Sequence, residues 1–270
     1  MALRARSGDR LGLITLALLL LVTIAAWAGV IIQAISMTTG GPSAGADMSA
    51  GMGPLITLAG LVAFIAAWAV MMTAMMLPSA APTVLLYRAM TREHAAQGNP
   101  LASTWIFVLG YLVVWAAFGA IVYVAGQLAS AAFRGDMRLA EWAPYAVALV
   151  LLGAGAYQFT PLKRVCLRAC QSPLGFLMSH WRPGPGGAFR MGLAHGLYCT
   201  GCCWGLMAVL VAAGAMGLAW VLLIALVVAA EKLLPRGEWA ARITGLVLLA
   251  LGVLVAAQPQ IALVLRGQGM

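Results

Sequence analysis

Long apolar runs separated by short polar connections dominate the chain. The pattern predicts seven spans, at residues 11–35, 55–77, 101–128, 142–160, 189–214, 218–234 and 239–257. Most contain the roughly 20 apolar residues that a helix needs to cross the ~30 Å hydrocarbon core of a bilayer, and the sixth is at the short limit. Backbone amides in hydrocarbon must bond within their own segment, so we expect helices. Proline marks expected breaks after the second, fourth and sixth runs, at Pro78, Pro161 and Pro235.

This pattern predicts an all-α, polytopic membrane bundle that forms a single domain over residues 1–270. Basic residues precede the first run, as they do in a secretion signal. However, that run is longer than a typical signal core and has no small-residue cleavage site near its middle, so we expect a retained first helix. The connection at 161–190 is amphiphilic and is not expected to span.

The distribution of charged residues predicts how the bundle is oriented across the membrane. Only 9% of the residues are charged, 63% are apolar and the mean hydropathy is +0.98, which suits lipid bilayer rather than water. All but three of the 16 Lys and Arg residues fall in the N-terminal tail and in alternate connections. This bias predicts the N-terminus inside and the C-terminus outside. The basic residues form short clusters without interleaved aromatics, so nucleic acid is not an expected partner.

The fifth run carries the residues least expected in lipid. On an ideal helix Met191, His195, Cys199 and Cys202 share a stripe about 80° wide, and Cys203 lies further round the same side. Packing explains any one of these cysteines, and a bond to a carbonyl explains the histidine. Together they favour a metal site, because ionisable groups inside spans usually serve function. The stripe is about 10 Å long, so one ion would need ligands from other helices or a distortion at the glycines of this run.

The second run ends in four methionines, Met71, Met72, Met75 and Met76. On a helix they form two i,i+4 pairs on adjacent faces. Thioethers are soft, neutral ligands that suit Cu(I). The alternative is that these methionines only fill gaps in helix packing.

The predicted topology brings these candidates to one depth in the membrane. The methionines lie at the inner end of the second run, and the fifth run begins inside. Glu231, at the end of the sixth run, lies at the same depth. Three roles are open to it: metal ligand, proton-relay group or ion-pair partner of Lys232. Cys166 and Cys170 lie in the adjoining inner connection. Soft ligands from three elements are therefore predicted to converge.

Short motifs also occur in a fixed order along most of the chain. They are the Met71–Pro78 segment, Gly110-Tyr111 with Trp115, Tyr157-Gln158 with Pro161-Leu162-Lys163, Cys166-x-x-x-Cys170, the His195–Trp204 block and Glu231-Lys232. Together they resemble an uncharacterised bacterial family described as predicted metal-binding integral membrane proteins. The resemblance implies a multi-pass protein of the bacterial inner (plasma) membrane that binds metal through these Met, Cys and His positions. It implies no particular activity.

The ligand types favour copper among the metals. Thiol, imidazole and thioether suit Cu(I), and the near-absence of carboxylates within the runs argues against Mg, Ca or Mn. Zinc stays open through Cys and His. We predict a soft-metal protein, rather than an enzyme, that transports copper or delivers it to a metalloenzyme. A metallochaperone or that metalloenzyme is the expected partner, and an oligomer is compatible with the sequence.

Two other functions fit the same residues. Cys199 and Cys202 form a C-x-x-C pair, which suits a membrane thiol–disulfide oxidoreductase with Cys166 and Cys170 as a relay. The four methionines have no role in such a relay. A scaffold subunit whose soft residues only pack is the third alternative.

Overall fold

The fold is built from helices throughout the described part of the chain. The computed structural model describes residues 2–39, 57–93, 100–135, 141–212 and 217–265, and no strand occurs among them. The helices are α1 (Ala2–Thr39), α2 (Leu58–Glu93), α3 (Pro100–Gly135), α5 (Ala143–Tyr157), α6 (Pro161–Gln171), α7 (Pro173–His180), α8 (Gly184–Ala212), α9 (Leu218–Leu233), α10 (Gly237–Ala257) and α11 (Gln260–Leu265). The predicted all-α class is confirmed.

Five helices of the described residues are long and apolar enough to cross a membrane. The qualifying stretches are Gly12–Ser36, Leu58–Thr91, Thr104–Ala131, Gly184–Ala212 and Gly237–Ala257. A sixth is added if α5 and α6, which meet at a bend of 65°, are counted as one span. The sixth predicted run, 218–234, is the helix α9 of 16 residues. The architecture is therefore compatible with a multi-pass membrane protein.

Two helix boundaries differ from the expected breaks. α2 continues through Pro78 and Pro82 to Glu93, although Pro78 was expected to end it. Proline removes one backbone donor, but neighbouring helices support a proline-containing helix in the way they do in membranes. α8 begins at Gly184, before the predicted start at residue 189. The φ of +77° at Gly184 is outside the helical range and is readily adopted by glycine, so this residue marks the point where the helix starts.

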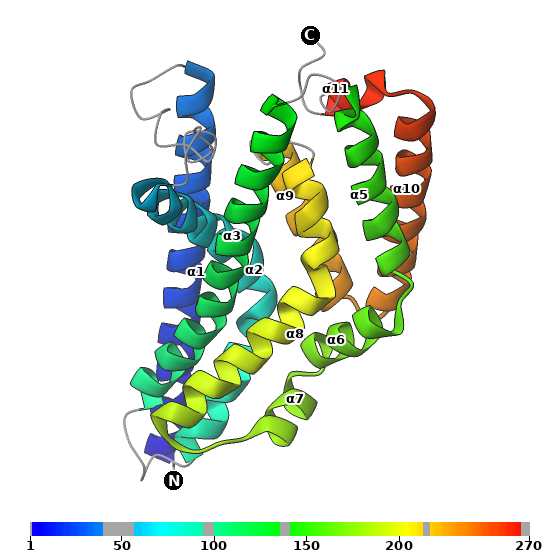
Figure 1. Cartoon of the computed structure of the whole chain (residues 1–270). Helices are drawn as coiled ribbons and strands as arrows, with labels where there is room; N and C mark the ends of the chain where they lie inside the picture. The colour runs from blue at the N-terminus through cyan, green and yellow to red at the C-terminus, as the bar shows by residue number, and fades with distance from the viewer. Residues whose placement is uncertain (1, 40–56, 94–99, 136–140, 213–216, 266–270) are drawn as a thin grey trace.

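The helices pack in two groups joined by α8 and α9 (Figure 1). α1 packs on α2 and α2 on α3, while α5 pairs with α10 on the other side. α8 packs along α3 and also contacts α5, α6 and α9. Glycine permits the close approach of α3 to α8: a Cβ added at Gly110 would lie 3.1 Å from the backbone nitrogen of Leu193, and one at Gly196 would lie 2.9 Å from Cβ of Val114.

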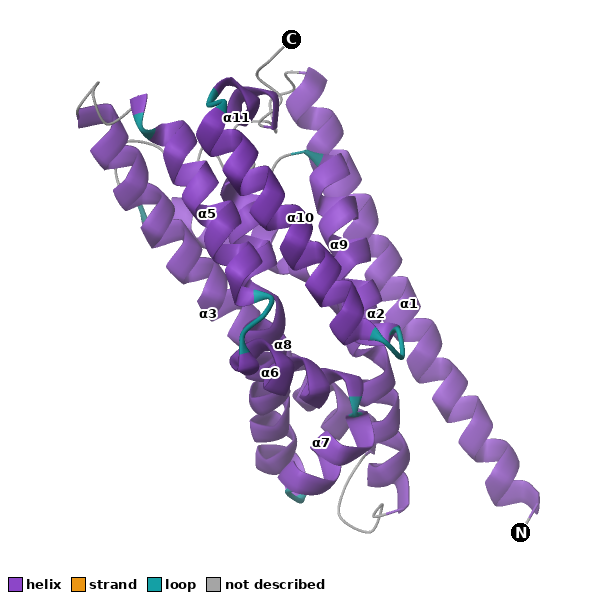
Figure 2. Ribbon diagram, turned by 90° about the vertical axis from the view of Figure 1, so that its right-hand side faces the viewer, coloured by secondary structure: helices purple, strands orange, loops and turns teal. Residues whose placement is uncertain are grey.

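The short helices α6 and α7 lie beside the lower half of α8 (Figure 2). α6 begins after Thr160, whose side chain accepts a hydrogen bond from the backbone nitrogen of Lys163 at 3.3 Å. It turns one face inward, burying Cys166, Leu167 and Cys170. The predicted amphiphilic connection is thus two helices of 11 and 8 residues.

Large apolar side chains cover much of the outer surface of the bundle. Leu21 and Ile24 on α1 are 63% and 67% exposed, and Leu246 on α10 is 60% exposed. Exposed apolar surface on this scale is unfavourable in water and suits lipid. The four methionines of α2 and the five cysteines lie in the interior.

Candidate soft-metal site

α8 supplies the centre of the candidate site. His195, Cys199, Cys202 and Cys203 are each no more than 2% exposed, and α8 is continuous through the glycines between them. The thiols of Cys202 and Cys203 both donate to the backbone oxygen of Cys199 at 3.0 Å. These two thiols therefore point along their own helix.

Cys199 differs from its neighbours because its sulfur accepts hydrogen bonds. Nζ of Lys232 on α9 donates to Sγ of Cys199 at 2.9 Å. The hydroxyl of Tyr111 on α3 lies 3.0 Å from the same sulfur. Sγ of Cys199 is thus the sulfur of this group that is stabilised as an electron-rich ligand, by a neighbouring positive charge.

α6 brings further sulfur to the same place. Sγ of Cys170 lies 4.0 Å from Sγ of Cys202, and Cys170 also interacts with Cys199. Two sulfurs bound to one tetrahedral ion at about 2.3 Å lie about 3.8 Å apart, so this separation is close to that of shared ligands. Cys166 packs against α8, where a Cβ added at Gly201 would lie 2.7 Å from its sulfur. All five cysteines carry free thiols.

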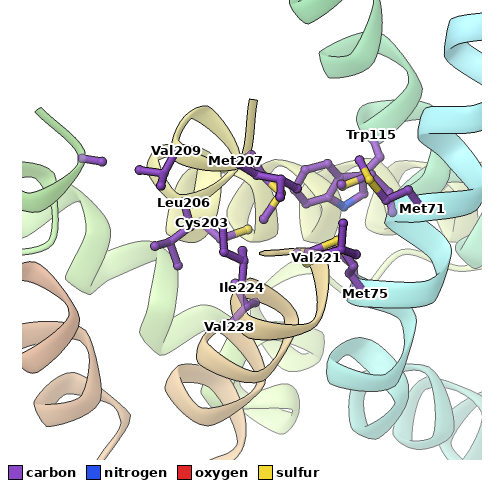
Figure 3. Packing of buried hydrophobic residues seen from close by; sticks show 14 of the residues in the cluster. Met71, Met75, Trp115, Cys203, Leu206, Met207, Val209, Val221, Ile224 and Val228 are labelled. Atoms are coloured by element: carbon purple, nitrogen blue, oxygen red, sulfur yellow. The ribbon is translucent and has the colours of Figure 1, made fainter. Parts of the chain in front are cut away.

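The four methionines of α2 are buried in the same apolar core as the thiols. Met71 and Met75 point from α2 toward Trp115, with Met207 and Cys203 of α8 on the far side of the ring (Figure 3). Met72 is fully buried in the core. Sδ of Met76 lies 3.7 Å from Nζ of Lys232, which places this thioether beside the cation that also contacts Cys199.

Glu231 does not face the thiols. Its Oε2 accepts a hydrogen bond from Nζ of Lys163 at 2.6 Å, and both side chains are 1% exposed. Its backbone oxygen accepts another from Nε2 of Gln171 at 2.7 Å. The ion pair that the sequence suggested for Glu231 and Lys232 is therefore formed by Glu231 and Lys163, which ties α9 to α6.

His195 and Met191 lie on the side of α8 that faces a second cluster of aromatic residues. The ring of His195 packs near Phe107, Tyr111 and Phe176, with centroids 6.0, 5.7 and 5.1 Å away. Its Nδ1 has no hydrogen-bond partner among the described residues. Sδ of Met191 accepts a hydrogen bond from the backbone nitrogen of Arg182 at 3.3 Å.

The group is not arranged as a finished metal site. Among the described residues, no three or more Cys, His, Asp or Glu side chains are positioned to hold one ion together. The physical reason is visible in the bonds above: two thiols point at their own backbone, and the ammonium of Lys232 stands between Cys199 and Met76. The chemistry of the donors nevertheless fits Cu(I), because thiol and thioether sulfur converge in an interior without a free carboxylate among them.

Sequence reasoning missed three contributors to this site. Lys163 was counted only among the basic residues of the inner connections, and Lys232 was considered only as an ion-pair partner of Glu231. The observed partner of each is set by tertiary packing. Tyr111 stood in one of the ordered motifs but had no assigned role. A lysine at the end of an apolar run is a signal that could have identified Lys232, because a buried ammonium requires partners.

The comparisons with known proteins associate the chain with copper. Residues 65–255 match the family PpoB2, which is described as a copper chaperone. No curated protein and no solved structure matches the chain. The matched region includes the four methionines of α2, all five cysteines and Lys232. The chain therefore belongs to the copper chaperone family PpoB2.

Proposed function

We propose that this protein binds Cu(I) inside the membrane on a cluster of sulfur ligands and delivers it to a copper-dependent enzyme. The observation that carries the proposal is the convergence of sulfur from α2, α6 and α8 around Cys199 in a closed apolar interior. Membership of a copper chaperone family supports copper as the cargo and delivery as its fate.

The ligands of the carried ion are Cys199, Cys202 and Cys170, with Met76 as a thioether. The buried sulfurs of Cys203, Met71, Met72 and Met75 extend this soft lining toward α3 and α9. Cu(I) is held by such ligands in preference to hard cations. Zinc, which the Cys and His residues left open, has less support because thioether sulfur does not suit it.

Exposure of the thiols suggests a route for the ion. Cys166 and Cys170 on α6 are 8% exposed, whereas Cys199, Cys202 and Cys203 are 1% exposed. Copper would therefore enter or leave through α6 and exchange from one sulfur to the next. His195, whose Nδ1 is unsatisfied within the described residues, lies one turn before Cys199 and extends the route along α8.

The proposed setting is the bacterial inner membrane, with the N-terminus inside. α1 begins at one end of the bundle and α11 lies at the other, as an odd number of crossings requires (Figure 1). The antiparallel pair α5 and α10 carries exposed aromatic residues at opposite ends, Trp142 and Tyr145 on one and Trp239 on the other. Such residues mark the two membrane interfaces. With the N-terminus inside, as the charge bias predicts, α6 and α7 belong to the inner side of the proposed topology.

Copper loading tests the proposal. Protein purified in detergent and loaded with Cu(I) without oxygen should retain about one copper ion per chain, and a Cys199→Ala/Cys202→Ala variant should lose it. Met191→Leu is the matched control, because Met191 is buried on the same helix outside the sulfur group, and it should load like the wild type. Equal copper in all three proteins would contradict the site. An oxidised Cys170–Cys202 pair trapped in a protein that binds no copper would favour the thiol relay instead.

A further inference from the structure

One positive group lies among the sulfur ligands. Lys232 is 6% exposed, and its Nζ is 2.9 Å from Sγ of Cys199 and 3.7 Å from Sδ of Met76. It also donates to Oγ of Ser79 at 3.4 Å. An ammonium inside a membrane bundle persists only with partners of this kind. Here two of the three partners are the proposed ligands of the cargo.

The two sulfurs come from different helices and approach the same cation. Met76 belongs to α2 and Cys199 to α8, and Lys232 reaches between them from α9. A soft cation held by these two sulfurs would take the place that the ammonium fills. Two positive charges held beside the same two sulfurs would repel each other strongly in an interior of low dielectric. Copper bound at this place would therefore favour movement of the ammonium away from the sulfurs.

We propose that Lys232 competes with copper for Cys199 and so makes the cargo releasable; this inference rests on the proposed function. In the copper-free protein the ammonium donates to the sulfur of Cys199 and contacts that of Met76. When Cu(I) binds, the ammonium turns away with its proton retained. One positive charge replaces another, so the charge among the sulfurs is unchanged.

The competition solves a difficulty that every carrier of Cu(I) meets. An enclosed set of thiol and thioether ligands holds the ion tightly, whereas delivery requires that the ion leave. The free energy of copper binding is reduced by that of displacing Lys232, and the return of the ammonium to Cys199 favours release. Lys232 is therefore a positioning residue that sets the affinity without binding the ion.

Titration of loaded protein with a Cu(I) chelator tests the inference through the copper dissociation constant. Lys232→Leu removes the charge and should bind Cu(I) at least about tenfold more tightly than the wild type, with slower transfer to the chelator. Lys232→Gln should change in the same direction, and it carries the test if the leucine variant does not fold. Lys232→Arg keeps the charge and should stay near the wild-type value.

Arg190→Gln is the matched control for charge alone. Arg190 is an exposed cation on α8, so its loss changes the net charge equally without touching the sulfurs. A similar gain in affinity in this variant, or unchanged or weaker copper binding in both uncharged Lys232 variants, would overturn the inference and leave the copper site standing. Failure of the wild type to bind Cu(I) would instead remove the proposed function itself.

Discussion

The buried charged residues are held by specific polar partners rather than by apolar packing. Glu231 and Lys232 are neighbours in the sequence, yet adjacent residues on a helix point about 100° apart, and they find separate partners. Glu231 meets Lys163, while Lys232 meets Cys199. The sequence placed both at the end of an apolar run. Their partners were not predictable, because Lys163 belongs to a connection whose fold depends on the whole bundle.

The buried pair of Lys163 and Glu231 should stabilise the protein only when both partners are present. Lys163→Met leaves a carboxylate buried without its cation, which costs about 3–5 kcal/mol of unfolding free energy. Adding Glu231→Gln to this variant should recover much of the loss. Reversible unfolding in mixed micelles measures both values.

The exposed pair of Arg168 and Glu238 provides the matched control. Its side chains are 68% and 30% exposed, so Arg168→Gln should change stability little. Losses for the Lys163 and Glu231 variants that simply add, or that match the loss at Arg168, would show that the buried pair is not coupled.

At the scale of helices, the lengths of the apolar runs predicted most of the helices, and the spacing of polar and sulfur-containing residues predicted some of their buried faces. His195, Cys199 and Cys202 are all buried on α8, as their spacing predicted, although His195 has different neighbours from the two thiols. The continuation of α2 past Pro78 was not predicted, because its support comes from other helices. The break after α5 was predicted at Pro161, but the 65° bend that brings Cys170 near Cys202 was not. The C-x-x-C spacing drew attention to Cys199 with Cys202, whereas the short sulfur–sulfur distance joins two helices.

The contact of α6 with α8 should depend on Gly201. A Cβ at this position would lie 2.7 Å from Sγ of Cys166, so Gly201→Ala must displace this sulfur, either by turning the Cys166 side chain or by moving α6 outward. We expect a loss of about 1–3 kcal/mol in unfolding free energy and weaker copper binding. Gly153→Ala on α5 is the control, because nothing lies within 4 Å of its added Cβ. Copper binding that is unchanged in Gly201→Ala would show that the position of α6 does not matter to the site.

At the scale of the whole molecule, the predicted convergence of soft ligands separates into two parts. Met76, Cys170, Cys199 and Cys202 lie around one point with Lys232, while His195 turns toward a neighbouring aromatic cluster. Topology derived from charge could place all of them at one depth. It could not assign them to sides of a helix, because rotation about each helix axis is fixed by packing.

The central claim is that sulfur from several helices holds the carried copper. X-ray absorption at the copper edge of the Cu(I)-loaded wild type tests it most directly, because the nearest neighbours of the ion are identified by element and distance. The account predicts a first shell dominated by sulfur at about 2.3 Å, with the signal reduced in Cys199→Ala/Cys202→Ala. A first shell dominated by nitrogen or oxygen would contradict it, and would place the copper away from Cys199.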